Sequence, residues 1–236
     1  MSRWRIAAAL LFTAVLGVSV WQLWVIQGNY ARESEIHERA LQYKPSESEG
    51  RGGPDPAIAA LQAQNGDAVG WLRIPGTRVD YPFVQAGDND YYLRRDLFGE
   101  SAAAGTIFMD CRCVPDFSGR STIIYGHHMR NGSMFQNISL FGEQEYFDLH
   151  RTGVITLLDR EIALEFFACA VVKADDPVIY SQPQTPEEQA ALLRSLERQA
   201  KQWRDIGITQ ADNIVLLSTC SYQFDGARTV LAARAK

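Results

Sequence analysis

The amino-acid sequence predicts a mainly β domain, a closed or nearly closed barrel rich in antiparallel strands, behind an apolar N-terminal helix. Short runs of β-branched and aromatic residues recur from Gly70 onward, and Gly, Asp or Asn separates them. This spacing is typical of hairpin-connected strands that close into one barrel. The chain of 236 residues is 46% hydrophobic and 22% charged, a composition that indicates a folded protein with a core of ordinary size.

The chain begins with a segment that can cross a membrane. Residues 6–26 read IAAALLFTAVLGVSVWQLWVI, carry no charge, and as a helix would span about 30 Å. Arg3 and Arg5 precede this run, so the positive-inside rule places the N-terminus in the cytoplasm. We expect residues 1–28 to form a cytoplasmic start and a single-pass anchor in the cell membrane. A cleaved signal peptide is the alternative, although the run is longer than a signal core and no clear small-x-small site follows.

A charged stalk and a linker are expected over residues 29–56. The first half is charged and could be a helix, whereas the second half, Pro45 to Pro56, is rich in Ser, Gly, Glu and Pro. A short helix over Ala57–Gln64 would then begin the folded domain. We expect this domain, residues 57–236, to be extracellular.

The folded domain is predicted to consist of successive strands and one further helix. The strand candidates are, in chain order, VGWLRI, RVDYPFVQ, GTIFMD, STIIYG, GVITLLD, IALEFFACAVVK, NIVLLSTC and ARTVLAARA. Residues 185–203 predict a helix instead, with Thr185 as N-cap, Pro186 in the first turn and Glu188 completing a capping box. Its apolar stripe indicates a helix that packs on the barrel.

Cys220 ends a strand-like run, where a side chain can be reached from outside. A cysteine is a strong nucleophile only as a thiolate, which needs a base or a cation nearby. His127 directly follows the strand STIIYG, and Arg228 lies eight residues after Cys220, across an expected turn at Asp225–Gly226. That spacing can place the guanidinium beside the thiol, where it could hold an oxyanion. Spacing alone does not separate two interpretations. The three residues fit a catalytic set about as well as they fit an ordinary core cysteine, a histidine in a turn and a solvated arginine.

From Leu61 to the C-terminus the chain resembles a class B sortase. The resemblance rests on NGDAVGWLRIPGTRVDYPFVQAGDNDYYL, GTIFMD, IIYGHHMRNGSMF, LLSTC and ARTVLAARAK, which stand in the family's order and roughly at its spacing. The helix predicted over residues 185–203 matches the helix that class B members insert before the penultimate strand. The resemblance implies an eight-stranded sortase-type β-barrel with N-terminal helices. It also implies a membrane-anchored cysteine transpeptidase of Gram-positive bacteria.

The resemblance further implies a reaction and its residues. A sortase cleaves the C-terminal sorting signal of a secreted protein after Thr, holds the acyl group as a thioester, and transfers it to an amine of a peptidoglycan precursor or a pilin. Cys220 matches the nucleophile, His127 the general acid/base because it follows Gly126, and Arg228 the residue that steadies substrate and oxyanion. The same matching assigns the substrate groove to Asn89, Leu93, Tyr125, Tyr180 and Ser218. No metal or other cofactor is implied.

Three positions depart from the family pattern, and the cysteines form no spaced framework. Leu216 takes a position where Thr is frequent, Cys113 one where Asn is frequent, and Ser221 follows the nucleophile where an acidic residue is common. Cys111 and Cys113 are too close within a predicted strand to bridge each other without strain, and Cys169 lies in an apolar run. We therefore expect no structural disulfide.

Other functions remain open at this point. Cys111, Cys113, His127 and His128 are ligand types for zinc, although they lack the usual two-residue gaps. A catalytically silent adhesion or scaffold barrel is a second alternative. A hydrolytic cysteine peptidase is a third, and differs only in that water resolves the thioester. A net charge of −5 without a Lys/Arg-rich run argues against a nucleic-acid partner.

Overall fold

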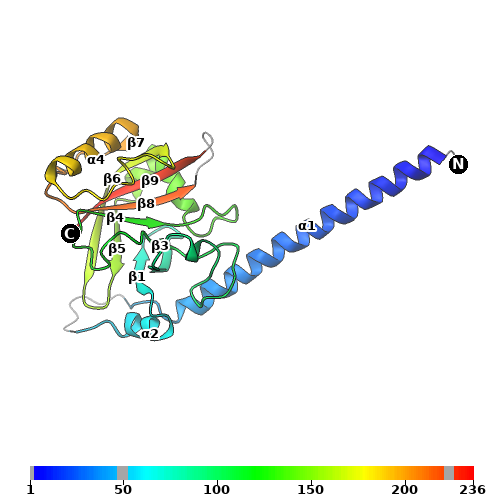
Figure 1. Cartoon of the computed structure of the whole chain (residues 1–236), viewed down its shortest axis with the longest axis horizontal. Coiled ribbons are helices and arrows are strands. Elements are labelled where there is room, and N and C mark those ends of the chain that lie inside the picture. The colour runs from blue at the N-terminus through cyan, green and yellow to red at the C-terminus, as the bar shows by residue number, and fades with distance from the viewer. Residues whose placement is uncertain (1–2, 47–52, 221–225) are drawn as a thin grey trace. The chain divides into compact units, whose positions relative to one another are not determined.

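A computed structural model of the chain describes residues 3–46, 53–220 and 226–236, and Figure 1 shows its course. Contacts divide the chain into two compact units, Met1–Arg39 and Ala40–Lys236. Helix α1, Arg3–Leu41, is one continuous helix, so the charged first part of the predicted stalk continues the apolar segment. Of the helices in the described ranges, α1 alone is long and apolar enough to cross a membrane, with a mean hydropathy of 2.0 over its best window.

Helix α2, Pro56–Gln64, begins the folded unit where a short helix was predicted. The Asp55 side chain caps it by accepting hydrogen bonds from the backbone N–H groups of Ala57 and Ile58. Ile58 and Leu61 are fully buried on the side of the helix that faces the core. The cap and this apolar face explain why so short a helix forms.

Nine strands of the described residues form one sheet. The strands are β1 Ala68–Arg73, β2 Asp80–Val84, β3 Phe108–Met109, β4 Ser121–Tyr125, β5 Thr152–Thr156, β6 Glu161–Lys173, β7 Ala200–Trp203, β8 Ile214–Cys220 and β9 Ala227–Ala235. The helices between them are the 3₁₀ segments η1 Tyr91–Leu93 and η2 Gln136–Gly142, and the α-helices α3 Gln144–Leu149 and α4 Pro186–Gln199.

The sheet closes into a barrel. Its order is β5-β1-β2-β3-β4-β8-β9-β6-β7, and β5 also pairs with β6, so eight strands form a ring and β7 is added outside it. The pairs β2–β3 and β4–β8 are parallel, and the other pairs in the ring are antiparallel. The predicted mainly β, eight-stranded, antiparallel-rich barrel is confirmed.

Strand β8 is one of the strands of this ring and pairs with β4 on one edge and β9 on the other. Its residues from Ile214 to Thr219 are all buried, because a strand with neighbours on both edges and packing on both faces has no solvent side. Cys220, at the end of the strand, is half-buried. The strand thus delivers the thiol to the rim of the barrel.

The helix predicted over residues 185–203 is shorter in the structure. Helix α4 ends at Gln199, and the next four residues form β7, which pairs with β6. Trp203, the last residue of the predicted helix, lies in β7, and its ring packs edge-on against Phe167 of β6 with the ring centroids 5.4 Å apart. Beyond Glu165 the edge of β6 is no longer paired with β5, and pairing with this free edge overrides the helical pattern of residues 200–203. The predicted N-cap holds, because Thr185 Oγ1 accepts a hydrogen bond from the N–H of Glu188.

Cys111 and Cys113 lie in a turn after β3, and the prediction of a strand was wrong at these two positions. The turn forms because the N–H of Cys113 donates to the carbonyl of Asp110, and the Asp110 side chain accepts from the N–H of Arg112. All four cysteines of the chain are free, and Cys113 and Cys169 are buried.

Candidate active site

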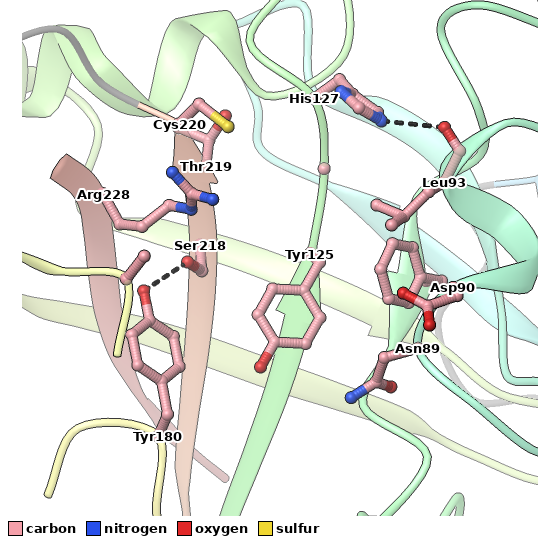
Figure 2. Close-up of a pocket in the computed structure, with 13 residues that line it drawn as sticks. Asn89, Asp90, Leu93, Tyr125, His127, Tyr180, Ser218, Thr219, Cys220 and Arg228 are labelled. Carbon is pink, nitrogen blue, oxygen red and sulfur yellow. Dashed lines mark hydrogen bonds between the residues drawn. The ribbon is translucent and has the colours of Figure 1, made fainter. Parts of the chain in front are cut away.

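A pocket of about 440 Å³ opens at the rim of the barrel, where β4, β8 and β9 meet η1, the residues just before it, and the loop that follows β6. Every site residue expected from the sequence lines this pocket (Figure 2). They are Asn89, Leu93, Tyr125, His127, Tyr180, Ser218, Cys220 and Arg228. Segments that are far apart in the chain, residues 89–93, 125–127, 180 and 218–228, therefore meet at one place.

Cys220 and Arg228 face each other across the β8–β9 hairpin. They are direct partners in the antiparallel register, so their side chains project from the same face of the sheet. Both are half-buried, and Figure 2 shows them together on one side of the pocket. The expected turn falls partly on residues 221–225, and the departure at Ser221 also lies outside the described residues.

His127 comes from the end of β4, and Gly126 determines how the chain leaves that strand. A Cβ added at Gly126 would lie 2.6 Å from Cγ of the fully buried Phe135, so only glycine fits without displacing the ring. The N–H of Gly126 donates to the carbonyl of Ser218 at 3.1 Å, and the N–H of Phe135 donates to the carbonyl of His127 at 3.0 Å. These contacts hold the His127 backbone at the pocket.

The His127 ring is oriented by a backbone carbonyl. Its Nε2 lies 3.0 Å from the carbonyl oxygen of Leu93, and Figure 2 shows the ring turned toward that oxygen, across the pocket from Cys220. A carbonyl can only accept a hydrogen bond, so Nε2 carries a proton. In the neutral ring Nδ1 is then the nitrogen with the free lone pair. The arrangement suits a group that gains and loses a proton at Nδ1.

Two tyrosines line the pocket, Tyr180 in the wall beside β8 and Tyr125 between that wall and the opposite one. The Tyr180 hydroxyl and the Ser218 hydroxyl are 2.9 Å apart, which ties the loop after β6 to the strand that carries Cys220. The Tyr125 and Tyr180 rings stack with centroids 6.2 Å apart. Burial raises the pKa of Tyr180 to about 12, although the Ser218 hydrogen bond opposes this shift, so the phenol stays neutral at physiological pH.

Asn89 forms part of the opposite wall. Its side-chain oxygen accepts a hydrogen bond from the N–H of Cys111 at 2.8 Å. The amide NH₂ group therefore keeps its donors for other partners. Figure 2 shows the side chain on the same side of the pocket as Leu93. An amide donor at this place can bind a carbonyl oxygen of an extended peptide.

Sequence reasoning missed several residues of the lining. They are Asp90, Phe108, Gly126, Ala174 and Thr219. Gly126 and Thr219 are neighbours of predicted residues, so their adjacency in the sequence was an available signal. Phe108 is the register partner of Tyr125 across β3 and β4, and Ala174 ends the hydrogen-bonded run that β6 makes with β9. These two positions become visible only once the strands are paired.

The described part of the chain contains no cluster of side chains that would support the zinc alternative. Among residues 3–46, 53–220 and 226–236, no group of three or more His, Cys, Asp or Glu side chains is placed to hold a metal ion. Cys113 Sγ accepts hydrogen bonds from the N–H of Ile123 and the side chain of Gln182, both at 3.3 Å. These two thiol contacts belong to the packing of the turn.

Comparisons with known proteins agree with this fold. The family model described as a sortase domain matches residues 72–236. Sortase B of Listeria monocytogenes is 35% identical over 167 residues, which are 70% of this chain and 67% of the relative. The solved structure of sortase B from Bacillus anthracis gives a TM-score of 0.78 at 32% identity and covers 88% of this chain and 97% of that one. Sortase B from the type II pilus of Streptococcus pneumoniae gives 0.65 at 39% identity, with 75% and 97% covered.

The extent of these matches is decisive. The family model runs from residue 72, within β1, to the C-terminus, and thus covers all the other strands of the ring that carries the pocket. The solved relatives share the closed barrel over nearly their entire length. The chain therefore belongs to the sortase family of cysteine transpeptidases, and within that family to class B.

Proposed function

We propose that this enzyme cleaves the C-terminal sorting signal of secreted proteins after a Thr residue and transfers the new acyl end to an amine of a peptidoglycan precursor or a pilin. The observation that carries the proposal is the arrangement of Cys220, Arg228 and His127 around one pocket. Acyl transfer needs a nucleophile, a proton donor for the leaving amine and a group that stabilises the oxyanion. The pocket offers one residue of the right chemistry for each role.

In the first half-reaction the Cys220 thiolate attacks the carbonyl carbon of the Thr. The C–S bond forms as the carbonyl becomes an oxyanion, and the peptide C–N bond then breaks to leave a thioester. His127 as imidazolium donates the proton that the departing amine requires. Because Nε2 is held by the Leu93 carbonyl, Nδ1 is the nitrogen that exchanges this proton. Positioned acid/base groups of this kind contribute about 10²–10⁴ in rate.

Arg228 is suited to the developing negative charge. Its Nη1 donates to the carbonyl of Ala227 at 3.2 Å, and none of the ion pairs between described residues involves it. The remaining guanidinium donors are therefore available to a substrate carbonyl, which gains charge in the tetrahedral intermediate. In the second half-reaction an incoming amine attacks the thioester carbon and neutral His127 accepts its proton. The C–S bond then breaks, which releases the amide product and regenerates the Cys220 thiolate.

The N-terminal part of the chain fits an enzyme fixed to a membrane. We infer a single-pass anchor within residues 1–28, with the N-terminus cytoplasmic, a stalk and linker over residues 29–56 and an extracellular catalytic domain over residues 57–236. The long apolar helix and the arginines before its apolar run, Arg3 and Arg5, support this topology. An anchored enzyme would meet secreted substrates as they leave the membrane.

Mass spectrometry of the full chain in detergent micelles tests the proposal. The enzyme is incubated with a library of sorting-signal peptides, with and without a panel of amines. The expected result is an acyl adduct on Cys220 and, with an amine present, an amide-linked product. C220A should form neither, whereas C111A, which removes another partly exposed thiol, should form both.

Two outcomes would contradict the proposal. If the enzyme is folded and its Cys220 thiol is titratable, but no peptide in the library acylates that thiol, the protein is a barrel without catalytic activity. An enzyme that releases only hydrolysed peptide at every amine concentration would be a peptidase, and the transfer step would be wrong.

A further inference from the structure

A turn that does not line the pocket is bonded to three residues that do. The DCRC turn, residues 110–113, follows β3, and none of its residues lines the pocket. It bonds to Asn89, Tyr125 and Tyr180, which come from three separate segments of the chain. No catalytic or substrate role was assigned to this turn from the sequence.

The centre of this arrangement is the carboxylate of Asp110, which has no solvent exposure. Its Oδ2 accepts the Tyr125 hydroxyl at 3.0 Å and Arg112 Nη2 at 2.6 Å. Its Oδ1 accepts Arg112 Nε at 2.8 Å and the Arg112 backbone N–H at 2.9 Å. Burial alone would raise the pKa of Asp110, but the hydrogen bonds from Arg112 and Tyr125 together outweigh it, and the pKa lies below its ordinary value.

The same turn reaches both walls of the pocket. Arg112 Nη2 donates to the Tyr180 carbonyl at 3.2 Å, on the side that also holds Ser218. The N–H of Cys111 donates to the Asn89 side chain at 2.8 Å on the other side. Tyr125, whose ring stacks on Tyr180, lies between these walls (Figure 2). The DCRC turn thus joins the two sides of the pocket, through Arg112 on one side and the backbone of Cys111 on the other.

The turn is itself held firmly in place. The Gln85 side chain donates to the carbonyls of Asp110 and Cys113 at 2.9 and 2.7 Å. The backbone N–H of Asp110 donates to the Ile123 carbonyl of β4 at 2.9 Å. A turn fixed on both sides can transmit its geometry to the groups bonded to it. This is the role of a shell that supports a binding site.

We propose that Asp110 is a positioning residue for the substrate peptide: it fixes the Tyr125 ring and, through Arg112, the Tyr180 loop, and so sets the width of the groove between Asn89 and Tyr180. This inference rests on the proposed function, because the groove is the one that would bind the sorting signal. Asp110 touches neither the nucleophile nor the acid/base. Its loss should therefore weaken binding of substrate and transition state alike, which raises KM and leaves kcat nearly unchanged.

The test is steady-state peptide cleavage by the full chain in detergent micelles. D110N keeps the shape of the side chain but removes its charge, and we expect KM to rise about tenfold, the loss typical of one hydrogen bond to a charged group. Y125F removes the partner hydroxyl while keeping the ring, and we expect a similar rise in KM. The double variant should be no worse than the worse single variant, because both changes break the same hydrogen bond.

D116N is the matched control, because Asp116 is exposed, lies in the same connection between β3 and β4, and its side chain accepts a hydrogen bond from the nearby N–H of Ser118. Its carbonyl also accepts a hydrogen bond from Arg160, a backbone contact that the substitution keeps. It should leave KM within about twofold and be additive with Y125F. Far-UV circular dichroism and the alkylation rate of Cys220 report whether each variant keeps its fold and its thiol. Should D110N fail to fold, Y125F and R112Q carry the same comparison.

The outcomes separate the two proposals. A wild-type enzyme that cleaves peptides, with D110N, Y125F and R112Q showing unchanged KM, overturns the positioning role and leaves the proposed function standing. A fall in kcat at constant KM overturns it as well, because the residue would then act on the chemical step. If the wild-type enzyme is folded but no peptide acylates it, the proposed function is overturned, and the positioning role with it.

Discussion

The close approach of Gly126 to Phe135 yields the sharpest prediction about this site. In G126A the new methyl group would lie 2.6 Å from Cγ and 2.7 Å from Cδ2 of the ring, distances that carbon atoms do not adopt. Phe135 is fully buried, so the ring cannot swing into solvent, and either the ring or the end of β4 must move. Overpacking of this kind costs about 1–3 kcal/mol of unfolding free energy.

Activity should fall together with stability. A shift at residue 126 weakens the Ser218 hydrogen bond and moves His127 away from the Leu93 carbonyl, so kcat should decrease more than KM changes. Urea denaturation measures the unfolding free energy, and peptide cleavage measures kcat and KM. G87A is the control, because a Cβ at Gly87 meets no atom within 4 Å.

A double-mutant cycle decides whether the cause is steric. F135L removes ring atoms at a cost of its own, but it also makes room for the methyl group of G126A. The double variant should therefore lose less unfolding free energy than the two single variants lose together, by at least about 0.5 kcal/mol. Strict additivity, or a G126A variant as stable as the wild-type protein, would refute the reasoning.

Three further predictions follow from burial and capping. The folded-state pKa of Asp110 is lowered, so the wild-type protein should have a larger unfolding free energy than D110N by an amount that is constant from about pH 8 to pH 5. This difference should decrease as the pH falls below about 4, and urea denaturation at each pH measures it. Burial raises the pKa of Cys113, and that of Cys169 to about 12, so iodoacetamide at pH 8 should alkylate Cys220 in the native protein and leave these two unmodified by peptide mapping. T185A removes the α4 cap and should lower the unfolding free energy by about 1 kcal/mol without changing KM; an unchanged urea midpoint would contradict this.

Local sequence was sufficient where the structural cause is local. The β8–β9 hairpin places Cys220 opposite Arg228 because their separation and the alternation of an antiparallel pair determine the register. The N-cap of α4 and the apolar stretch of α1 likewise depend on residues that are near one another in the chain. These features were predicted from spacing, charge and residue type.

Pairing between distant segments decided the rest. Residues 200–203 continue a helical pattern, yet they form a strand because β6 offers an edge to pair with. The DCRC turn looked like the end of a strand, and only the folded chain brings Asp110 against Tyr125 and Arg112 against the Tyr180 carbonyl. No periodicity records such contacts, because they join segments many residues apart.

The pocket shows the same division. Its individual residues were expected from a family resemblance, and nothing in the local pattern could bring residues 89–93, 125–127 and 218–228 together. Closure of the barrel, with β4 parallel to β8 and β5 joined to β6, collects them at one rim. The sequence by itself determined which side chains could do chemistry and which strands they end. The tertiary structure decided which of them meet, because the burial that drives barrel closure is a property of the whole chain.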